Sequence, residues 1–429
     1  MSRNLLPVLA LLMGTLFLFL GNGLHGLLLP MRGSSEGYSN EVLGLLGTSW
    51  AAGFVLGCFF APKVVMRVGH VRAFSSFISL IAIIALMTGI LVDQYWWVAL
   101  RAVTGFCIAG TSMIIESWLN ERATNESRGT IFSFYISITL IGVVGGQMLV
   151  PFGDVSTTIL FMISGIFYCL AMLPTTLSTA ASPQPLTSVS LDLPSLYRNS
   201  PVSFIGILLI GIANGAYGTL GAVFGAKAGL SSATIAVMMS ITIFVGALAQ
   251  FPAGKLSDTV DRRYVLATLS AVAALAAVLL VALQPHDAYL LIGFVALYGA
   301  AANALYPIAV AHANDYASAD DFVKVSGGLL LLFGIGTIIG PTLGGPVMTL
   351  LGPYALFAVT AIAHGLLTAY AIYRSQQRAA IPAAEREHVP SIPVGTSPMG
   401  TPEGLSLDPR AAPLPPQDEP DEKPQEDKP

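Results

Sequence analysis

The sequence predicts an all-α integral membrane protein with 12 transmembrane helices in two pseudo-symmetric six-helix bundles. Hydrophobic residues make up 54% of the 429 residues and charged residues only 10%, whereas a soluble domain carries about 25% charged residues because its surface must be hydrated. Twelve apolar stretches approach the length of about 20 helical residues that crosses a hydrocarbon core of about 30 Å. A polar connection and an internal repeat divide these stretches six to six.

The first apolar stretch follows a single Arg3 and could be mistaken for a secretory signal. It is too long for the apolar region of a signal peptide and lacks a small-residue cleavage site, so we interpret it as the first spanning helix. The first half is predicted to contain helices at residues 5–30, 42–62, 73–92, 96–118, 129–151 and 157–177. The second half is predicted to contain helices at residues 202–224, 232–252, 264–284, 288–312, 325–349 and 353–373.

Two polar segments complete the predicted organisation. Residues 178–200, rich in Ser, Thr and Pro, link a first bundle at 1–177 to a second at 201–375. The tail, residues 376–429, is rich in Pro and acidic residues and has few large apolar side chains. Such a segment buries too little to offset the entropy of ordering it, so we expect a disordered tail.

The basic residues predict the orientation. If the N-terminus is cytoplasmic, 13 Lys and Arg residues of the ends and loops lie inside and only Arg32 and Lys227 lie outside. Cytoplasmic loops carry the excess of Lys and Arg. We therefore expect a multi-pass protein of a bacterial inner membrane, with both termini, the linker and the tail in the cytoplasm.

The two halves repeat one another at a fixed offset. Asn22-Gly-Leu-His25-Gly in the first predicted helix has the counterpart Asn214-Gly-Ala-Tyr217-Gly in the seventh, 192 residues later. Ser39 and Ser231, both suited to cap a helix N-terminus, are separated by the same distance, as are the loops at 62–72 and 254–264. Repeated halves with polar groups near mid-membrane are typical of secondary transporters.

The loop at 254–263 reads Gly-Lys-Leu-Ser-Asp-Thr-Val-Asp-Arg-Arg and resembles the G-x-x-x-D-x-x-G-R-R loop of the major facilitator superfamily, with Asp261 in place of the second glycine. Residues 101–109 resemble the arginine motif of that superfamily. Glu116-Ser-Trp-Leu-Asn, Arg128-Gly and residues 306–315 resemble its YcaD-like branch. The resemblance covers about residues 5–375 and implies a secondary transporter. Some related alphaproteobacterial members import riboflavin, which makes riboflavin the most specific expectation for the solute.

A polar group inside an apolar helix costs free energy unless it is hydrogen-bonded, so it usually faces the bundle interior or a wet cavity. Such a residue either binds the solute or makes a satisfied packing contact between helices. The repeat places Asn22, His25, Asn214 and Tyr217 first among the candidates. Aromatic faces and amides together would suit a flat, hydrogen-bonding solute. The complete set expected to bind the solute is Asn22, His25, Asn214, Tyr217, Arg101, Tyr135, Gln147, Asn303 and Tyr306.

The gating candidates lie at the expected cytoplasmic ends of the helices. In the first-half loop Met66 replaces the usual Asp, so Glu116 is expected to supply the carboxylate and to pair with Arg67 or Arg128. A solvated ion pair at a helix end is the alternative, and it would contribute little. In the second half Asp258, Arg262 and Arg263 are expected to pair across the halves or to cap a neighbouring helix.

The sequence contains no phosphate-binding Gly-Lys-Ser/Thr loop, nucleophile elbow or zinc-protease motif. The three cysteines lie in apolar stretches away from metal-ligand spacing. We therefore expect no enzyme, no cofactor, no metal and no nucleic-acid partner. The prediction is a monomeric secondary active transporter of a small organic solute, with drug or metabolite efflux as the alternative and a membrane sensor as a second one. The fifth predicted helix lacks the Gly-Pro motif of drug antiporters, which favours uptake.

Overall fold

The computed structural model describes residues 2–124, 127–176, 192–317, 322–378, 381–382, 386 and 401–408. All the regular structure in these ranges is helical, and each of the twelve predicted spanning segments is a helix. Eleven of them are long and apolar enough to cross a membrane, and the described part of the remaining one forms a shorter apolar helix. The predicted all-α membrane fold is confirmed.

The helices of the first half are α1 (Ser2–Ser35), α2 (Asn40–Val68), α3 (His70–Ile90), α4 (Gln94–Arg122), α5 (Arg128–Gln147) and α6 (Ile159–Thr176). Those of the second half are α8 (Pro201–Lys227), α9 (Ser232–Thr259), α10 (Arg262–Leu283), α11 (Ala288–Asn314), α12 (Phe322–Leu351) and α13 (Ala355–Ser375). The short elements are η1 (Val150–Phe152), α7 (Leu193–Asn199) and η4 (Gly404–Leu407).

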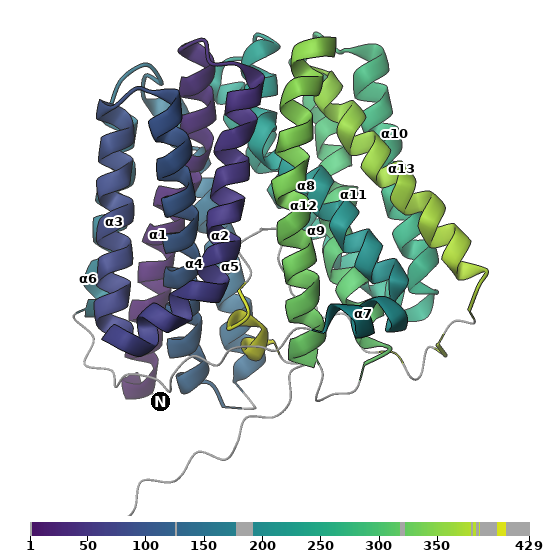
Figure 1. The fold of residues 1–429 in the computed structure, drawn as a ribbon, viewed down its shortest axis with the longest axis horizontal. Helices are drawn as coiled ribbons and strands as arrows, with labels where there is room; N and C mark the ends of the chain where they lie inside the picture. Colours follow the sequence, from purple (N-terminus) through teal and green to yellow (C-terminus); the bar gives the residue numbers. More distant parts are fainter. Residues whose placement is uncertain are drawn as a thin grey trace, which may run out of the picture.

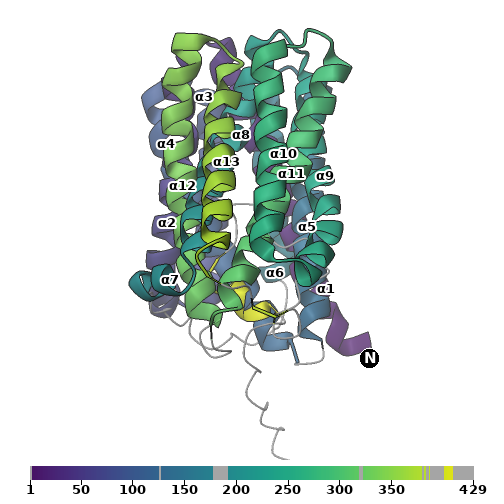
Figure 2. The same ribbon diagram turned by 90° about the vertical axis from the view of Figure 1, so that its right-hand side faces the viewer.

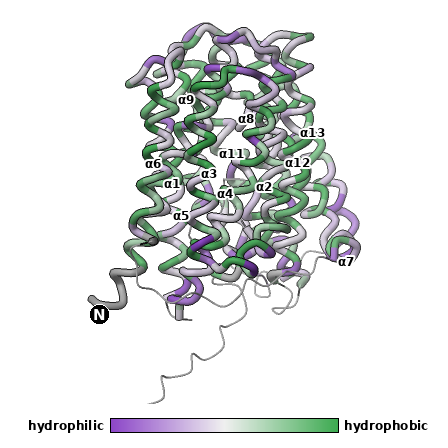
Figure 3. Tube along the Cα trace, turned by 60° about the vertical axis from the view of Figure 1, so that its left-hand side comes forward, coloured by the Kyte–Doolittle hydropathy of each residue, from purple (hydrophilic) through white to green (hydrophobic). Residues whose placement is uncertain are grey.

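The two halves stand side by side with their helices running between two common ends (Figures 1 and 2). We call the end that carries residue 2 the lower end and the opposite one the upper end. Apolar residues extend along the helices, and hydrophilic residues gather toward the two ends (Figure 3). This distribution is the one expected of a protein whose middle section lies in lipid.

The packing repeats from one half to the other. In the first half α1 packs on α5, α2 on α4 and α3 on α6. In the second half the corresponding pairs are α8 with α12, α9 with α11 and α10 with α13. Ser39 and Ser231 cap equivalent helices, since their Oγ atoms accept from Val42 N at 3.4 Å and from Thr234 N at 3.2 Å. The two predicted N-caps are therefore confirmed.

Glycines allow the closest helix contacts. A Cβ atom at Gly53 of α2 would lie 1.9 Å from the carbonyl oxygen of Ala102, and one at Gly105 of α4 would lie 2.0 Å from that of Trp50. In the second half a Cβ at Gly340 of α12 would lie 2.1 Å from the carbonyl oxygen of Ile212. Small residues at membrane helix interfaces bring the backbones together in this way.

Two short segments differ from the sequence expectations. In the predicted linker, Asp192 accepts a hydrogen bond from Ser195 N at 3.0 Å and caps α7, while residues 178–191 lie outside the described residues. In the predicted disordered tail, residues 401–408 are described and contain the turn η4 at the lower end. Composition missed this turn because its stability comes from the bundle, in which Leu407 is fully buried.

Candidate functional site

A cavity of about 240 Å³ lies between the two halves. Its walls come from α1, α2, α4 and α5 on one side and from α8, α9, α11 and α12 on the other. Leu, Val and Gly residues make up much of the wall, and a smaller number of polar and aromatic side chains interrupt it. Pockets for small organic ligands commonly have this composition.

Direct contacts join the two halves toward the upper end of the cavity. Thr48 of α2 lies 2.9 Å from the hydroxyl of Thr342 on α12, and Asn40 Nδ2 donates to Thr349 Oγ1 at 3.2 Å. Across α5 and α9, Ser240 Oγ donates to Gln147 Oε1 at 3.0 Å. These direct side-chain hydrogen bonds join α2 with α12 and α5 with α9.

The structure brings together six of the nine residues predicted to bind a solute. Asn22 and Asn214, the first members of the repeated motif, line the cavity from opposite halves. The other four that line it are Arg101, Gln147, Tyr217 and Asn303. The repeat thus identified a pair of equivalent positions on the two walls.

Arg101 is the positive charge of the cavity wall. Its Nε donates to the carbonyl oxygen of Leu46 at 3.4 Å, and its guanidinium carbon lies 5.7 Å from the centre of the Trp50 ring. No carboxylate forms an ion pair with Arg101 in the part of the chain that the structure describes. An arginine stacked on an aromatic ring presents donors suited to a carbonyl or an anionic oxygen.

Thr242 of α9 organises the opposite wall. Its hydroxyl lies 2.9 Å from Tyr217 OH, and its carbonyl oxygen accepts from Asn303 Nδ2 at 3.1 Å. Sequence reasoning missed both Thr242 and Trp50. The repeat contains the signal that would have found them, because Trp50 and Thr242 are separated by the same 192 residues as Asn22 and Asn214.

Three predicted site residues lie outside the cavity wall. His25 is 1% exposed and its ring centre lies 5.9 Å from that of Phe161, so it packs in the core of the first half. Tyr135 donates its hydroxyl hydrogen to Glu116 Oε1 at 2.8 Å. Tyr306 packs edge-on against Phe333, with ring centres 5.0 Å apart. Each of these contacts is made with a residue of the same half.

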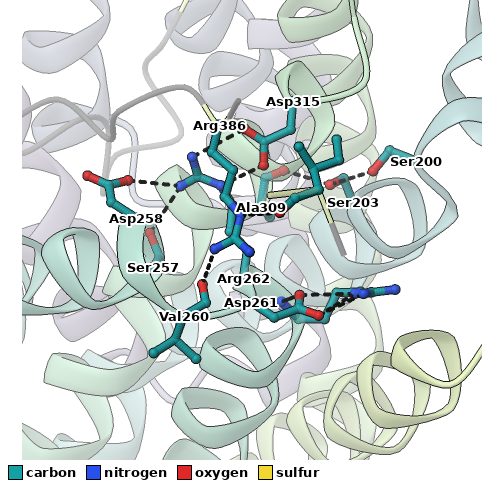
Figure 4. A network of polar contacts seen from close by, with 12 residues as sticks. Ser200, Ser203, Ser257, Asp258, Val260, Asp261, Arg262, Ala309, Asp315 and Arg386 are labelled. Atoms are coloured by element: carbon teal, nitrogen blue, oxygen red, sulfur yellow. Dashed lines mark hydrogen bonds and ion pairs between the residues drawn. The ribbon is translucent and has the colours of Figure 1, made fainter. Parts of the chain in front are cut away.

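The basic loop between α9 and α10 forms a network inside the second half (Figure 4). Arg262 is bidentate to Asp315, with Nε–Oδ2 at 2.7 Å and Nη2–Oδ1 at 3.2 Å, and its Nη1 also contacts Asp258 Oδ1 at 3.3 Å. Arg263 binds Asp261 at 2.7 Å and donates to the carbonyl oxygen of Arg378 at 2.8 Å. The described contacts of both arginines therefore stabilise the lower end of the second bundle. None of these described contacts is the expected pairing across the halves.

The predicted latch of the first half also differs from the structure. Glu116 accepts from the hydroxyls of Tyr135 and Thr401, and no ion pair of Glu116 with Arg67 or Arg128 is present among the described residues. Arg67 is exposed at the end of α2, whereas Arg128 is buried at the start of α5. The neutral hydroxyl donors replace the cation that we expected, because Glu116 points into the bundle.

Comparison with known proteins gives consistent results. A model of the Major Facilitator Superfamily matches residues 11–227 and 202–411. An uncharacterized MFS-type transporter of Yersinia pestis (strain Pestoides F) is 28% identical over 366 residues, which are 84% of this chain and 94% of that protein. The uncharacterized MFS-type transporter YcaD of Shigella flexneri serotype 5b is 27% identical over 368 residues, again 84% and 94% of the two chains.

Two solved transporter structures share the fold. The nucleoside transporter NupG superposes with a TM-score of 0.68 at 18% identity, over 87% of this chain and 98% of that one. A bacterial homologue of the human lysosomal transporter Spinster, inward-facing and occupied, gives 0.70 at 16% identity over 89% and 97%. With two related bundles around a shared cavity and a family match along most of its length, this chain belongs to the Major Facilitator Superfamily of transporters, which are not enzymes.

Proposed function

We propose that this protein is a monomeric secondary transporter that imports a small organic solute across the bacterial inner membrane by alternating access. The observation that carries the proposal is the cavity, because both halves contribute polar side chains to one site. A solute bound between two bundles can be released to either side when the bundles rock against each other. One chain supplies the whole described wall, which is consistent with a monomer.

The cavity chemistry favours a flat, hydrogen-bonding solute. Trp50, Tyr217 and Tyr298 offer aromatic faces, and Asn22 and Asn214 offer amide groups on opposite walls. Arg101 adds a cation that would pair with a carbonyl or acidic group of the solute. Riboflavin, a planar ring system with several carbonyl and ring-nitrogen acceptors, is our specific proposal.

The distribution of basic residues supports a cytoplasmic position for the lower end. The lower end carries Arg67, Arg72, Lys255 and the Arg262-Arg263 pair, whereas the upper loops carry Arg32 and Lys227. By the excess of Lys and Arg in cytoplasmic loops, the lower end is the cytoplasmic one, and both termini are then cytoplasmic. The direct hydrogen bonds between the halves, at the upper end, would then lie on the outer side of the membrane.

Uptake of labelled riboflavin by a riboflavin auxotroph that expresses the chain tests the proposal. Asn214→Ala, in the cavity wall, is expected to reduce uptake at least tenfold, while Asn199→Ala, with an exposed side chain at the lower surface, should leave it unchanged. Resistance to toxic compounds without riboflavin uptake would instead support efflux. Equal uptake by both variants would show that the cavity is not the transport site.

A further inference from the structure

Residues 401–408 of the tail occupy a defined place at the lower end of the bundle. The turn η4 contacts α4 and α5 of the first half and α12 of the second half (Figure 1). Thr401 is 1% exposed, Leu407 0% and Asp408 2%. Segments that merely lie on a surface keep part of each side chain in water, so these values indicate a docked segment.

Glu116 is the polar centre of the docking site. The Thr401 hydroxyl donates to Glu116 Oε2, and the Tyr135 hydroxyl donates to Oε1 at 2.8 Å. One turn further along α4, Asn120 Nδ2 donates to the carbonyl oxygen of Glu403 at 3.2 Å. The tail therefore supplies one of the two described hydroxyl donors to a carboxylate that is 1% exposed. Undocking would leave that oxygen without its donor, which is costly in a buried position.

The shape of the segment fits this site closely. A Cβ atom on Gly404 would lie 2.8 Å from both Cδ and Oε1 of Glu116, so the backbone approaches the carboxylate as nearly as a residue without a side chain allows. Leu407 belongs to the apolar core of the first half, which also includes Ile115 and Leu119. The negative charge of Asp408 acts on the Arg128 guanidinium. The fit of Gly404 against Glu116, the burial of Leu407 and the charge of Asp408 acting on Arg128 therefore all support one docked position.

The docked segment bridges the halves at the lower end, away from the hydrogen bonds that join α2 with α12 and α5 with α9. At the upper end α2 and α12 join the halves, whereas at the lower end the segment touches α4 and α5 on one side and α12 on the other. We propose that residues 401–408 are an internal ligand of the site around Glu116, that they close the lower opening of the cavity, and that they must leave before solute crosses there. The closing role rests on the proposed transport function, whereas the docking does not.

A binding experiment tests the docking without any transported solute. Two truncated chains form a matched pair, one ending at residue 400 and one ending at residue 408, because both lack the acidic end of the tail and only the first lacks the docked segment. A fluorescent peptide of residues 398–410 is added to each purified chain, and its anisotropy is measured. The peptide should bind the chain ending at 400 at least tenfold more tightly than the chain ending at 408, in which the site is occupied.

The same assay with a Gly404→Ala peptide should show a loss of affinity, since the methyl group would lie 2.8 Å from the Glu116 carboxyl group, which would have to shift. This change does not depend on folding of the membrane protein. Equal binding of the peptide to both chains, or equal affinity of the two peptides for the chain ending at 400, would overturn the docking.

Transport then tests the closing role. The chain ending at 400 should take up riboflavin faster than the chain ending at 408. If the peptide binds as expected and the two chains transport at the same rate, the docking stands and the closing role is overturned. If the peptide binds and neither chain nor the full-length protein transports riboflavin, the solute assignment fails and the docking stands.

Discussion

The buried ion pair between Arg262 and Asp315 gives a prediction whose magnitude follows from geometry. The Arg262 side chain is 1% exposed and that of Asp315 3%, with two hydrogen bonds between them, whereas Asp258 is 19% exposed at 3.3 Å. Removing one partner of a buried pair costs about 3–5 kcal/mol because the other charge stays buried. Asp315→Ala should therefore lower the free energy of unfolding by about 3–5 kcal/mol, and Asp258→Ala by about 1 kcal/mol or less.

The measurement is equilibrium unfolding of the purified protein in mixed micelles of dodecylmaltoside and SDS, followed by far-UV circular dichroism. The double variant Arg262→Met, Asp315→Leu should recover most of the loss, since an apolar pair of similar volume removes both buried charges. Equal losses for Asp315→Ala and Asp258→Ala would contradict this reasoning. So would a double variant less stable than Asp315→Ala alone.

The remaining predictions concern packing, the cavity and pH. In the same assay Gly53→Val should lower the free energy of unfolding by about 1–3 kcal/mol through overpacking, because its Cβ would lie 1.9 Å from the Ala102 carbonyl oxygen. An unchanged free energy of unfolding would disprove the tight contact. Gly218→Leu should keep stability and abolish solute-induced thermal stabilisation, since Gly218 lines the cavity with nothing within 4 Å of its Cβ position; unchanged stabilisation would place the solute elsewhere. Arg101→Met should weaken solute binding by about 1.5–3 kcal/mol, which is the contribution of a hydrogen bond to a charged group. A binding titration measures this change, and equal affinity of the variant and the wild-type protein would exclude a direct contact. Burial raises the pKa of Glu403 to about 7, so peptide docking should be strongest below about pH 4.5 and weaken as pH rises through about 7, whereas a Glu403→Gln peptide should respond less to pH, with only Glu116 and Asp408 left to titrate at the site; a wild-type peptide that binds equally at pH 5 and pH 8 would contradict the raised pKa.

Hydropathy located the twelve predicted helices, because polar or charged residues, Gly or Pro separate the apolar runs along the sequence. The same reasoning could not find α7, whose seven residues carry no periodic pattern. It also missed η4, where Leu407 is buried by helices almost three hundred residues away along the chain. Short elements of this kind owe their structure to tertiary contacts, which local composition does not contain.

The candidate site was predictable where the repeat applied and less so elsewhere. Asn22 and Asn214 occupy the same position of the repeated motif, and they line the same cavity from opposite walls. His25 and Tyr217 share the motif as well, yet the structure buries the first against Phe161 and places the second in the wall. A repeat predicts equivalent backbone positions, and the neighbouring side chains of each half then decide where a residue points.

The glycine contacts between α2 and α4 have a mechanical consequence. At Gly53 and Gly105 the two backbones meet directly, so at these positions no side chain can absorb a relative shift by changing rotamer. A helix of 29 residues spans about 43 Å at about 1.5 Å per residue. A small tilt of such a stiff pair at the upper end would therefore produce a larger displacement at the lower end, and the two helices would tilt together as a unit.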